Sequence, residues 1–301
     1  MSASRIKAAD RTKVCQQLVT ELKKRYSSRV PKTERNVLDS LLFAVCLENS
    51  SHDKAELALK RLHESFFDYN EARVSSITEL QHVFVDSTEP EWRAMRVRET
   101  LQFVFEGRYS YDLEDFRKRN LDSAEKYLKN IKSLTPFIVA YTMLTTLKTH
   151  TVPCSDSITR LSIWLGLLPD QTDVVAANDL LKAAVRKSDV PLFLFLINEA
   201  ANDPEFQEVI TKVPIPDQAD PLETLKGATS RLKDLIAGKI TPAKPAKKKK
   251  AAESTSTPKK KTTKTKSAAG STKTKTETKK KTATKTSKKT SAGTKTKKKT
   301  R

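Results

Sequence analysis

The stretch that decides the fold runs from residue 121 to residue 167 and reads LDSAEKYLKNIKSLTPFIVAYTMLTTLKTHTVPCSDSITRLSIWLGL. Its apolar spacing predicts a helix over 121–130, a tight hairpin over 131–136 and a second helix over 137–147. A short link through Cys154, Ser155 and Asp156 then leads into a third helix. This order of helix, hairpin, helix, link and helix guides the interpretation of the remaining sequence.

Helical periodicity extends across residues 1–240, and no alternation typical of strands is sustained. Segments 37–46, 137–147 and 190–197 are apolar nearly all round, which predicts helices at the centre of a core. Capping boxes are expected at Ser76 and at Thr88, the latter followed by Pro90. We therefore predict an all-α body of about ten helices in two lobes. Trp92 is expected in the core and the neighbouring Arg93 on a solvated face.

The last 61 residues differ from this body in composition. Residues 241–301 contain 23 Lys+Arg and 2 Asp+Glu, whereas residues 1–240 contain 34 of each. All 19 aromatic residues lie before Thr241, so the C-terminal segment cannot bury a core. We expect a folded body over residues 1–240 and a disordered, lysine-rich tail over residues 241–301.

Lysine runs recur along this tail and include Lys247, Lys248, Lys249, Lys250, Lys259 and Lys260. Lysine contacts phosphate as a point charge and carries little base information, so the expected partner is double-stranded DNA, bound largely without sequence preference. The composition resembles the tails of linker histones and of lysine-rich nucleoid proteins, and Thr257-Pro258-Lys259-Lys260 resembles their Ser/Thr-Pro-basic motif. A solubilising tail or a localisation signal is the alternative that charge leaves open.

Several classes of protein are not indicated. Three cysteines, odd in number and widely spaced, give neither a disulfide framework nor a metal knuckle, and the four histidines lack HExxH spacing, so no metal site is predicted. The longest apolar run, 190–197, is too short to span a bilayer. We expect an intracellular protein associated with DNA in a nucleoid or cytoplasm, or in a nucleus if the source is eukaryotic. The oligomeric state is left open, with a monomer as the expectation.

The order of elements over 121–167 resembles the helix-hairpin-helix DNA glycosylase superfamily, the endonuclease III-like group. The resemblance extends back through residues 41–49 and 80–105 and forward to about Asp203. It implies a multi-helix body with a hairpin that contacts DNA phosphate, here through Ser133, Leu134 and Thr135. The family's hairpin has glycines that let backbone N–H groups approach the phosphate, so these three residues imply a weaker clamp.

The catalytic positions of the family are also altered. The lysine that forms a Schiff base in bifunctional members aligns with Phe137, which cannot act as a nucleophile. The essential aspartate aligns with Ser155, and Asp156 follows one position later, about 100° further round a helix. Asp156 is therefore the candidate catalytic residue, and its alternative role is that of a first-turn acid at the positive end of the helix dipole.

The strand-entry loop of the family corresponds to residues 48–51. Asn49 is the candidate for a contact with DNA or a base, and its alternative role is a cap for the helix that starts near Asp53. No cysteine follows Cys154, so the four-cysteine iron-sulfur loop of endonuclease III is absent and no cofactor is predicted.

The leading interpretation is a DNA-binding protein with a base-excision glycosylase-like fold, lost or weakened catalysis and a histone-like tail. One alternative is an active monofunctional DNA N-glycosylase in base excision repair, a hydrolase without lysine-dependent lyase activity, that uses Asp156 to orient water. A second alternative is an architectural nucleoid protein whose tail alone engages DNA. Whether the chain is an enzyme is therefore open at this point.

Overall fold

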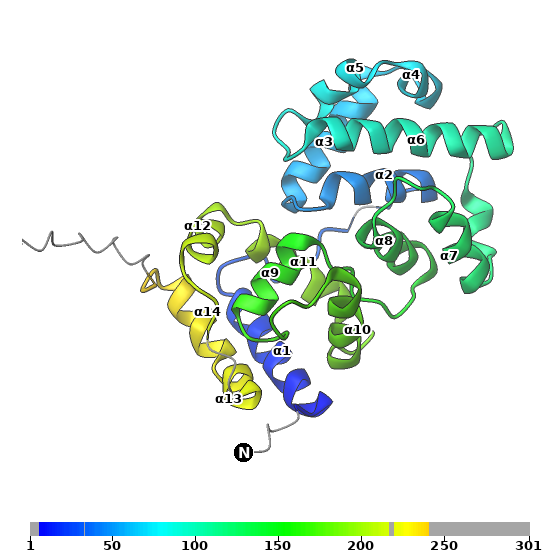
Figure 1. The fold of residues 1–301 in the computed structure, drawn as a ribbon. Coiled ribbons are helices and arrows are strands. Elements are labelled where there is room, and N and C mark those ends of the chain that lie inside the picture. The colour runs from blue at the N-terminus through cyan, green and yellow to red at the C-terminus, as the bar shows by residue number, and fades with distance from the viewer. Residues whose placement is uncertain (1–5, 33, 217–219, 241–301) are drawn as a thin grey trace, which may run out of the picture. The chain divides into compact units, whose positions relative to one another are not determined.

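The computed structural model describes residues 6–32, 34–216 and 220–240, and the predicted tail lies outside these ranges (Figure 1). The elements in the first half of the body are α1 (Ala8–Leu22), α2 (Val37–Leu47), α3 (His52–Ser65), α4 (Tyr69–Val74), α5 (Ile77–Gln81), η1 (His82–Phe84), α6 (Pro90–Arg108) and η2 (Glu114–Lys118). Those in the second half are α7 (Leu121–Lys129), α8 (Pro136–Leu147), α9 (Asp156–Trp164), α10 (Val174–Ala184), α11 (Val190–Ala201), α12 (Pro204–Lys212), α13 (Pro221–Lys226) and α14 (Ala228–Ile236).

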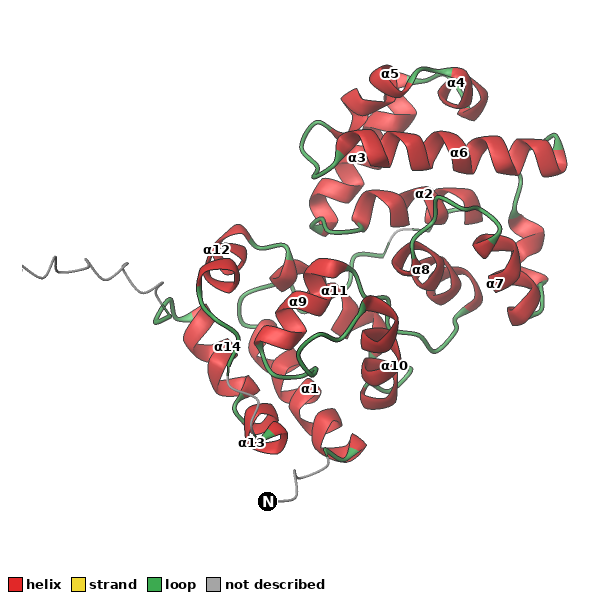
Figure 2. Ribbon diagram, viewed as in Figure 1, coloured by secondary structure: helices red, strands yellow, loops and turns green. Residues whose placement is uncertain are grey.

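The described residues contain helices and loops and no strand, which confirms the all-α prediction for this part of the chain (Figure 2). They form fourteen α-helices and two 3₁₀ helices, more than the ten expected. Two of the additional helices, α4 and α13, have six residues each. Such segments are too short to display an apolar stripe, so periodicity does not detect them.

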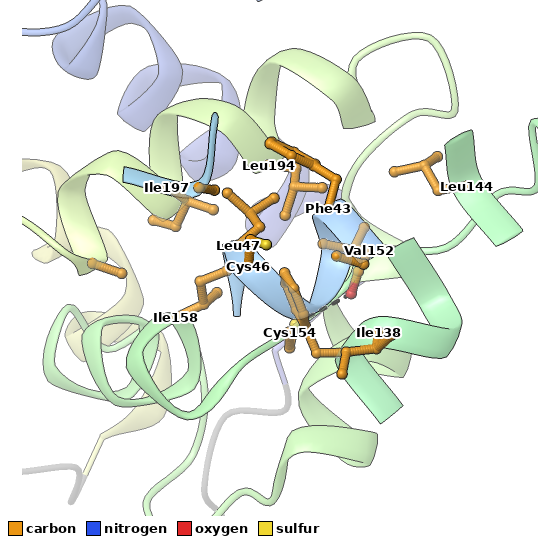
Figure 3. Packing of buried hydrophobic residues seen from close by; sticks show 14 of the residues in the cluster. Phe43, Cys46, Leu47, Ile138, Leu144, Val152, Cys154, Ile158, Leu194 and Ile197 are labelled. Carbon is orange, nitrogen blue, oxygen red and sulfur yellow. Dashed lines mark hydrogen bonds between the residues drawn. The ribbon is translucent and has the colours of Figure 1, made fainter. Parts of the chain in front are cut away.

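Helix α2 lies at the centre of the first group of helices and packs on α3, α6 and α8. Nearly all its residues are buried, and Leu41, Leu42 and Phe43 are fully so. Figure 3 shows side chains of α2 together with Ile138 of α8, Ile158 of α9 and Leu194 of α11. The segments that are apolar all round are therefore core helices, as predicted.

A second group forms around α1, which packs on α10, α11 and α14, while α9 packs on α11. Two arginines, one buried and one partly buried, stabilise this group of helices by hydrogen bonds to backbone carbonyls. Arg11 Nε donates to Leu167 O at 3.1 Å, and Arg231 Nη2 donates to Leu165 O at 2.6 Å. Between these acceptors Gly166 has φ +76°, and a Cβ there would come within 2.5 Å of Arg231 Nη2. Glycine at this position permits both the turn and the close approach.

The start of α6 differs from expectation. The capping box at Ser76 is present, but α6 begins instead after Glu89, which has left-handed φ and ψ and makes no side-chain cap. Pro90 occupies the first turn as expected. Trp92 is 54% exposed and Arg93 only 3% exposed, so both side-chain predictions were wrong. Arg93, Ala94 and Val97 share the buried face, and one residue earlier on a helix points about 100° away.

None of the helices formed by the described residues is both long and apolar enough to cross a bilayer.

Candidate nucleic-acid interface

The hairpin between α7 and α8 has the predicted form. Asn120 caps α7, and its side chain accepts from the Asp122 N–H at 2.9 Å. Thr135 caps α8 by accepting from the Ile138 N–H at 3.3 Å, and Pro136 takes the first helical position. Between the helices, the Leu134 N–H donates to Ile131 O at 3.1 Å and closes the turn. The sequence therefore makes a tight hairpin without glycine.

This hairpin leaves backbone donors free. The N–H groups of Lys132, Ser133 and Thr135 have no acceptor among the described residues. The Lys132 side chain is exposed and makes no ion pair with another described residue. By contrast, the Leu134 side chain packs against the core, and the Ser133 hydroxyl is buried without a partner. Backbone amides and one ammonium group are thus what this hairpin can offer to an anion.

Phe137 occupies a core position. It is 1% exposed, and its ring stacks on Tyr141 with centroids 6.0 Å apart and planes 27° apart. Burial also raises the pKa of Tyr141 to about 12, so its phenol stays protonated at neutral pH and does not act as a phenolate nucleophile. Phe137, which the sequence resemblance aligned with the lysine of the family, is therefore a buried core residue.

The N-terminus of α9 is satisfied by neutral side chains. Ser155 is 1% exposed, and its hydroxyl accepts from the Ile158 N–H at 3.4 Å and lies 3.0 Å from the Ser157 hydroxyl. Asp156 is the first residue of α9 and is exposed to solvent. Its carboxylate makes no hydrogen bond or ion pair with other described residues, so no group of the body holds it in a fixed orientation.

Asn49 lies beside this helix start. It follows α2 with φ 50°, a left-handed conformation that asparagine tolerates. Its Oδ1 accepts from the Ser157 N–H at 3.0 Å. Asn49 therefore caps α9, and not α3 as the capping alternative proposed, because the turn after α2 aims it at the other helix. The structure thus brings Asn49, Ser155 and Asp156 together at one place.

Two residues hold this turn: Arg93, which the sequence placed on a solvated face, and Asn198, which it did not single out. Buried Arg93 donates from Nη1 to Val45 O at 2.5 Å and to Cys46 O at 3.1 Å, and from Nη2 to Glu48 O. Asn198 of α11 donates to Ser50 O at 2.8 Å. Backbone carbonyl partners cannot be recognised from residue types, because every residue has one. The one signal in the sequence for a buried Arg93 was that its helix face is otherwise apolar.

A cavity of about 910 Å³ opens between α2, α8, α11 and residues 30–32 and 34–36. None of Asn49, Phe137, Ser155 or Asp156 lines it. In its wall Arg35 is stacked 3.8 Å above the Phe43 ring and paired with Glu56.

One carboxylate of this cavity's lining, Glu114, accepts from the Val37 N–H at 2.7 Å and pairs with Arg117 at 2.7 Å. These contacts, Arg117 first, lower the pKa of Glu114, which keeps it ionised at neutral pH. This lining carboxylate therefore cannot act as a general acid at neutral pH.

The cysteines are buried and unpaired, and burial raises the pKa of Cys15, Cys46 and Cys154 to about 12 in each case. In the described ranges no three His, Cys, Asp or Glu side chains gather at metal-binding spacing. The predicted DNA-binding lysines Lys247 to Lys250, Lys259 and Lys260 lie outside the described residues.

Comparison with known proteins gives a structural likeness without a sequence match. No model of a protein family and no curated protein sequence matches the chain. A solved endonuclease III in a non-covalent complex with DNA is similar, with a TM-score of 0.51 and 14% identity over 74% of this chain and 98% of that one.

Weaker likenesses are found to a trapped covalent endonuclease III–DNA intermediate, with a TM-score of 0.48 and 13% identity over 62% of this chain and 84% of that one. The 8-oxoguanine glycosylase/lyase of Clostridium acetobutylicum in complex with DNA gives a TM-score of 0.48 and 12% identity over 65% and 70% of the two chains. The hairpin geometry and the likeness that covers nearly all of endonuclease III agree, and the described body has the helix-hairpin-helix glycosylase fold.

Proposed function

We propose that this protein binds DNA through a glycosylase-like body in which base excision is lost or weakened, and that its basic C-terminal segment tethers it to DNA. The observation that carries the loss of chemistry is the start of α9. Ser155 and Asn49, both neutral, occupy the backbone N–H groups there, where base excision in this fold calls for a carboxylate.

The hairpin supports the DNA-binding part of the proposal. Three backbone N–H groups, at Lys132, Ser133 and Thr135, have no acceptor among the described residues. Oriented amides beside an exposed ammonium form a site suited to one phosphate. Because the hairpin lacks glycine, the approach is less close and the expected contribution to affinity is modest.

A base-release assay tests the chemical part. The purified full-length protein is incubated with a panel of duplexes that each carry one damaged base, and free base is measured. We expect no release, or release far slower than that by an active glycosylase run in parallel. Release at a useful rate would refute the loss of catalysis.

An active monofunctional glycosylase is the second candidate, favoured by one observation: Asp156 is exposed and unpaired at the helix start that Asn49 caps. Asp156→Asn removes the charge and keeps the shape. If the wild type releases a base and this variant does not, Asp156 is the catalytic carboxylate. A Schiff-base trapping assay must use residues 1–240, since lysines of the tail react adventitiously with an abasic site.

Truncation tests the tether. If about ten lysines of residues 241–301 engage phosphate, log affinity should fall with log salt at a slope of about −9 in the full chain. Residues 1–240 should bind undamaged duplex far more weakly and with a shallower slope. Equal slopes would remove the tail from the proposal, and complete loss of binding would favour the architectural alternative, in which the tail alone engages DNA.

A further inference from the structure

A groove between α1 and the C-terminal end of α10 carries positive charge in its lining. It encloses about 520 Å³ and is open to solvent. Its lining includes Lys13 of α1, Lys182 of α10 and Arg186, two residues beyond α10, together with His150. No Asp or Glu belongs to the lining. We refer to it as the α10 groove.

The three cations of the α10 groove are available to a ligand. Lys13, Lys182 and Arg186 are all exposed, and none of them makes an ion pair or side-chain hydrogen bond with another described residue. Many cations elsewhere on the body are paired, such as Arg25 with Asp203 at 2.8 Å and Arg108 with Asp115 at 2.6 Å. The charge of the α10 groove is therefore not already neutralised by ion pairs with the described residues.

The groove is held in shape by the backbone around it. His150 Nε2 lies 2.8 Å from Val185 O, and a carbonyl oxygen accepts, so Nε2 carries the proton and donates. This bond ties the link between α8 and α9 to the end of α10. The lining also holds three small residues, Ala9, Ala183 and Ala184, whose short side chains leave room for an anion beside the cations.

The chemistry of the lining favours a phosphate backbone. None of the exposed large apolar side chains of the body belongs to the lining, so the groove lacks the apolar anchors that a membrane or a protein partner would engage. Flexible, unpaired Lys and Arg side chains that leave base edges unread are typical of contacts to phosphate.

The α10 groove is separate from the hairpin. The hairpin lies at the N-terminal end of α8, and His150 follows its C-terminal end; α8 has 12 residues, a length of about 18 Å at 1.5 Å per residue. We infer that the α10 groove is a second surface of the body for the phosphate backbone of duplex DNA. The inference rests on the proposed DNA binding by the body and adds a site to it.

The test uses residues 1–240, because the buried hydrophobic core of the described residues lies between Val14 and Leu235. Binding of an undamaged labelled duplex is measured between about 50 and 200 mM salt. The triple variant Lys13→Gln, Lys182→Gln, Arg186→Gln should lower the magnitude of the salt slope by about 2.7, or about 0.9 for each phosphate that is no longer neutralised, and the affinity by roughly tenfold or more. Equal melting temperatures establish that the variants fold.

The matched control is Lys23→Gln, Lys54→Gln, Lys118→Gln, which removes the same charge from exposed residues outside the groove. It should leave the slope nearly unchanged. If the triple variant does not fold, Lys182→Gln with Arg186→Gln leaves α1 intact and should lower the slope by about 1.8.

Equal salt slopes for wild type and the groove variant would overturn the inference. So would a control variant that lowers the slope as much as the groove variant does. A hairpin variant, Ser133→Glu, separates the two sites. If it abolishes binding while the groove variant binds normally, the proposed function stands and the groove does not contact DNA. If the body binds no duplex at all, DNA binding by the body fails and the inference fails with it.

Discussion

Replacement of Arg93 tests what fixes the turn that carries Asn49. Arg93→Met keeps the aliphatic stem and removes the guanidinium, which donates to four backbone carbonyls. These belong to Thr88 at 2.9 Å, Val45 at 2.5 Å, Cys46 at 3.1 Å, and Glu48. Three of the four lie at the C-terminal end of α2, where carbonyls lack partners within the helix.

The magnitude follows from this geometry. Hydrogen bonds to charged groups contribute roughly 1.5–3 kcal/mol each, so four give a gross value of about 6–12 kcal/mol. The burial of the guanidinium opposes this, as the lowered pKa of Arg93 indicates. We expect a net loss of about 3–5 kcal/mol in the free energy of unfolding, as when one partner of a buried ionic contact is removed. That is a large share of the roughly 5–15 kcal/mol typical of a folded protein.

Urea unfolding of residues 1–240 measures the loss. Arg93→Lys keeps the charge and loses the planar guanidinium, so its free energy of unfolding should lie between those of wild type and Arg93→Met. The control is Arg98→Met on the same helix, since Arg98 makes no ion pair or hydrogen bond with another described residue; it should change stability by about 0.5 kcal/mol or less. A loss below about 1 kcal/mol for Arg93→Met, or one equal to the control, would refute the reasoning.

Three further outcomes are expected of residues 1–240. Asn49→Gly keeps the left-handed turn and loses the cap, so it should cost less in unfolding free energy than Asn49→Ala, which should cost about 1–2 kcal/mol in urea; the reverse order would exclude backbone strain. Phe137→Ala should cost about 3–5 kcal/mol in the same assay, because a buried ring is lost; a loss below about 1 kcal/mol would contradict the core position. Burial lowers the pKa of His52 below its unfolded value of about 6.5, so the stability it contributes is present above that pH and is lost as pH falls below it. The difference in unfolding free energy between wild type and His52→Gln should therefore change between about pH 7 and pH 5. A constant difference would show that His52 does not contribute to the pH dependence of stability.

The hairpin and the central helices could be predicted because their signals are local. A helix that is apolar all round, such as α2, has few alternatives to the core, and a proline at the start of α8 fixes where that helix begins. The capping box at Ser76 is also a local signal, because both of its residues, Ser76 and Glu79, lie within four positions of the sequence.

The contacts of the candidate site could not be predicted for the opposite reason. Asn49 and Ser157 are 108 positions apart, and nothing local to either residue indicates the other. Arg93 belongs to a segment that also holds Arg96 and Arg98, which suggests a solvated face. Its actual partners are backbone carbonyls, which every residue possesses. Trp92 and Arg93 are adjacent and point about 100° apart on α6, so which of them is buried depends on the face that packs on the core, and that face is set by distant elements.

The hydrogen bond from Arg231 to the Leu165 carbonyl has a mechanical consequence. The chain continues into residues 241–301 shortly after α14, so a force applied through that segment enters the body at α14. Arg231 of α14 donates to Leu165 O at 2.6 Å, and Leu165 caps the C-terminal end of α9. Tension therefore reaches α9 at one end, while Ser155 and Asn49 hold the backbone of its other end. If residues 241–301 are held on DNA as proposed, α9 would connect that tether to the candidate site, and its stiffness would set how much of a pull on the tail is transmitted.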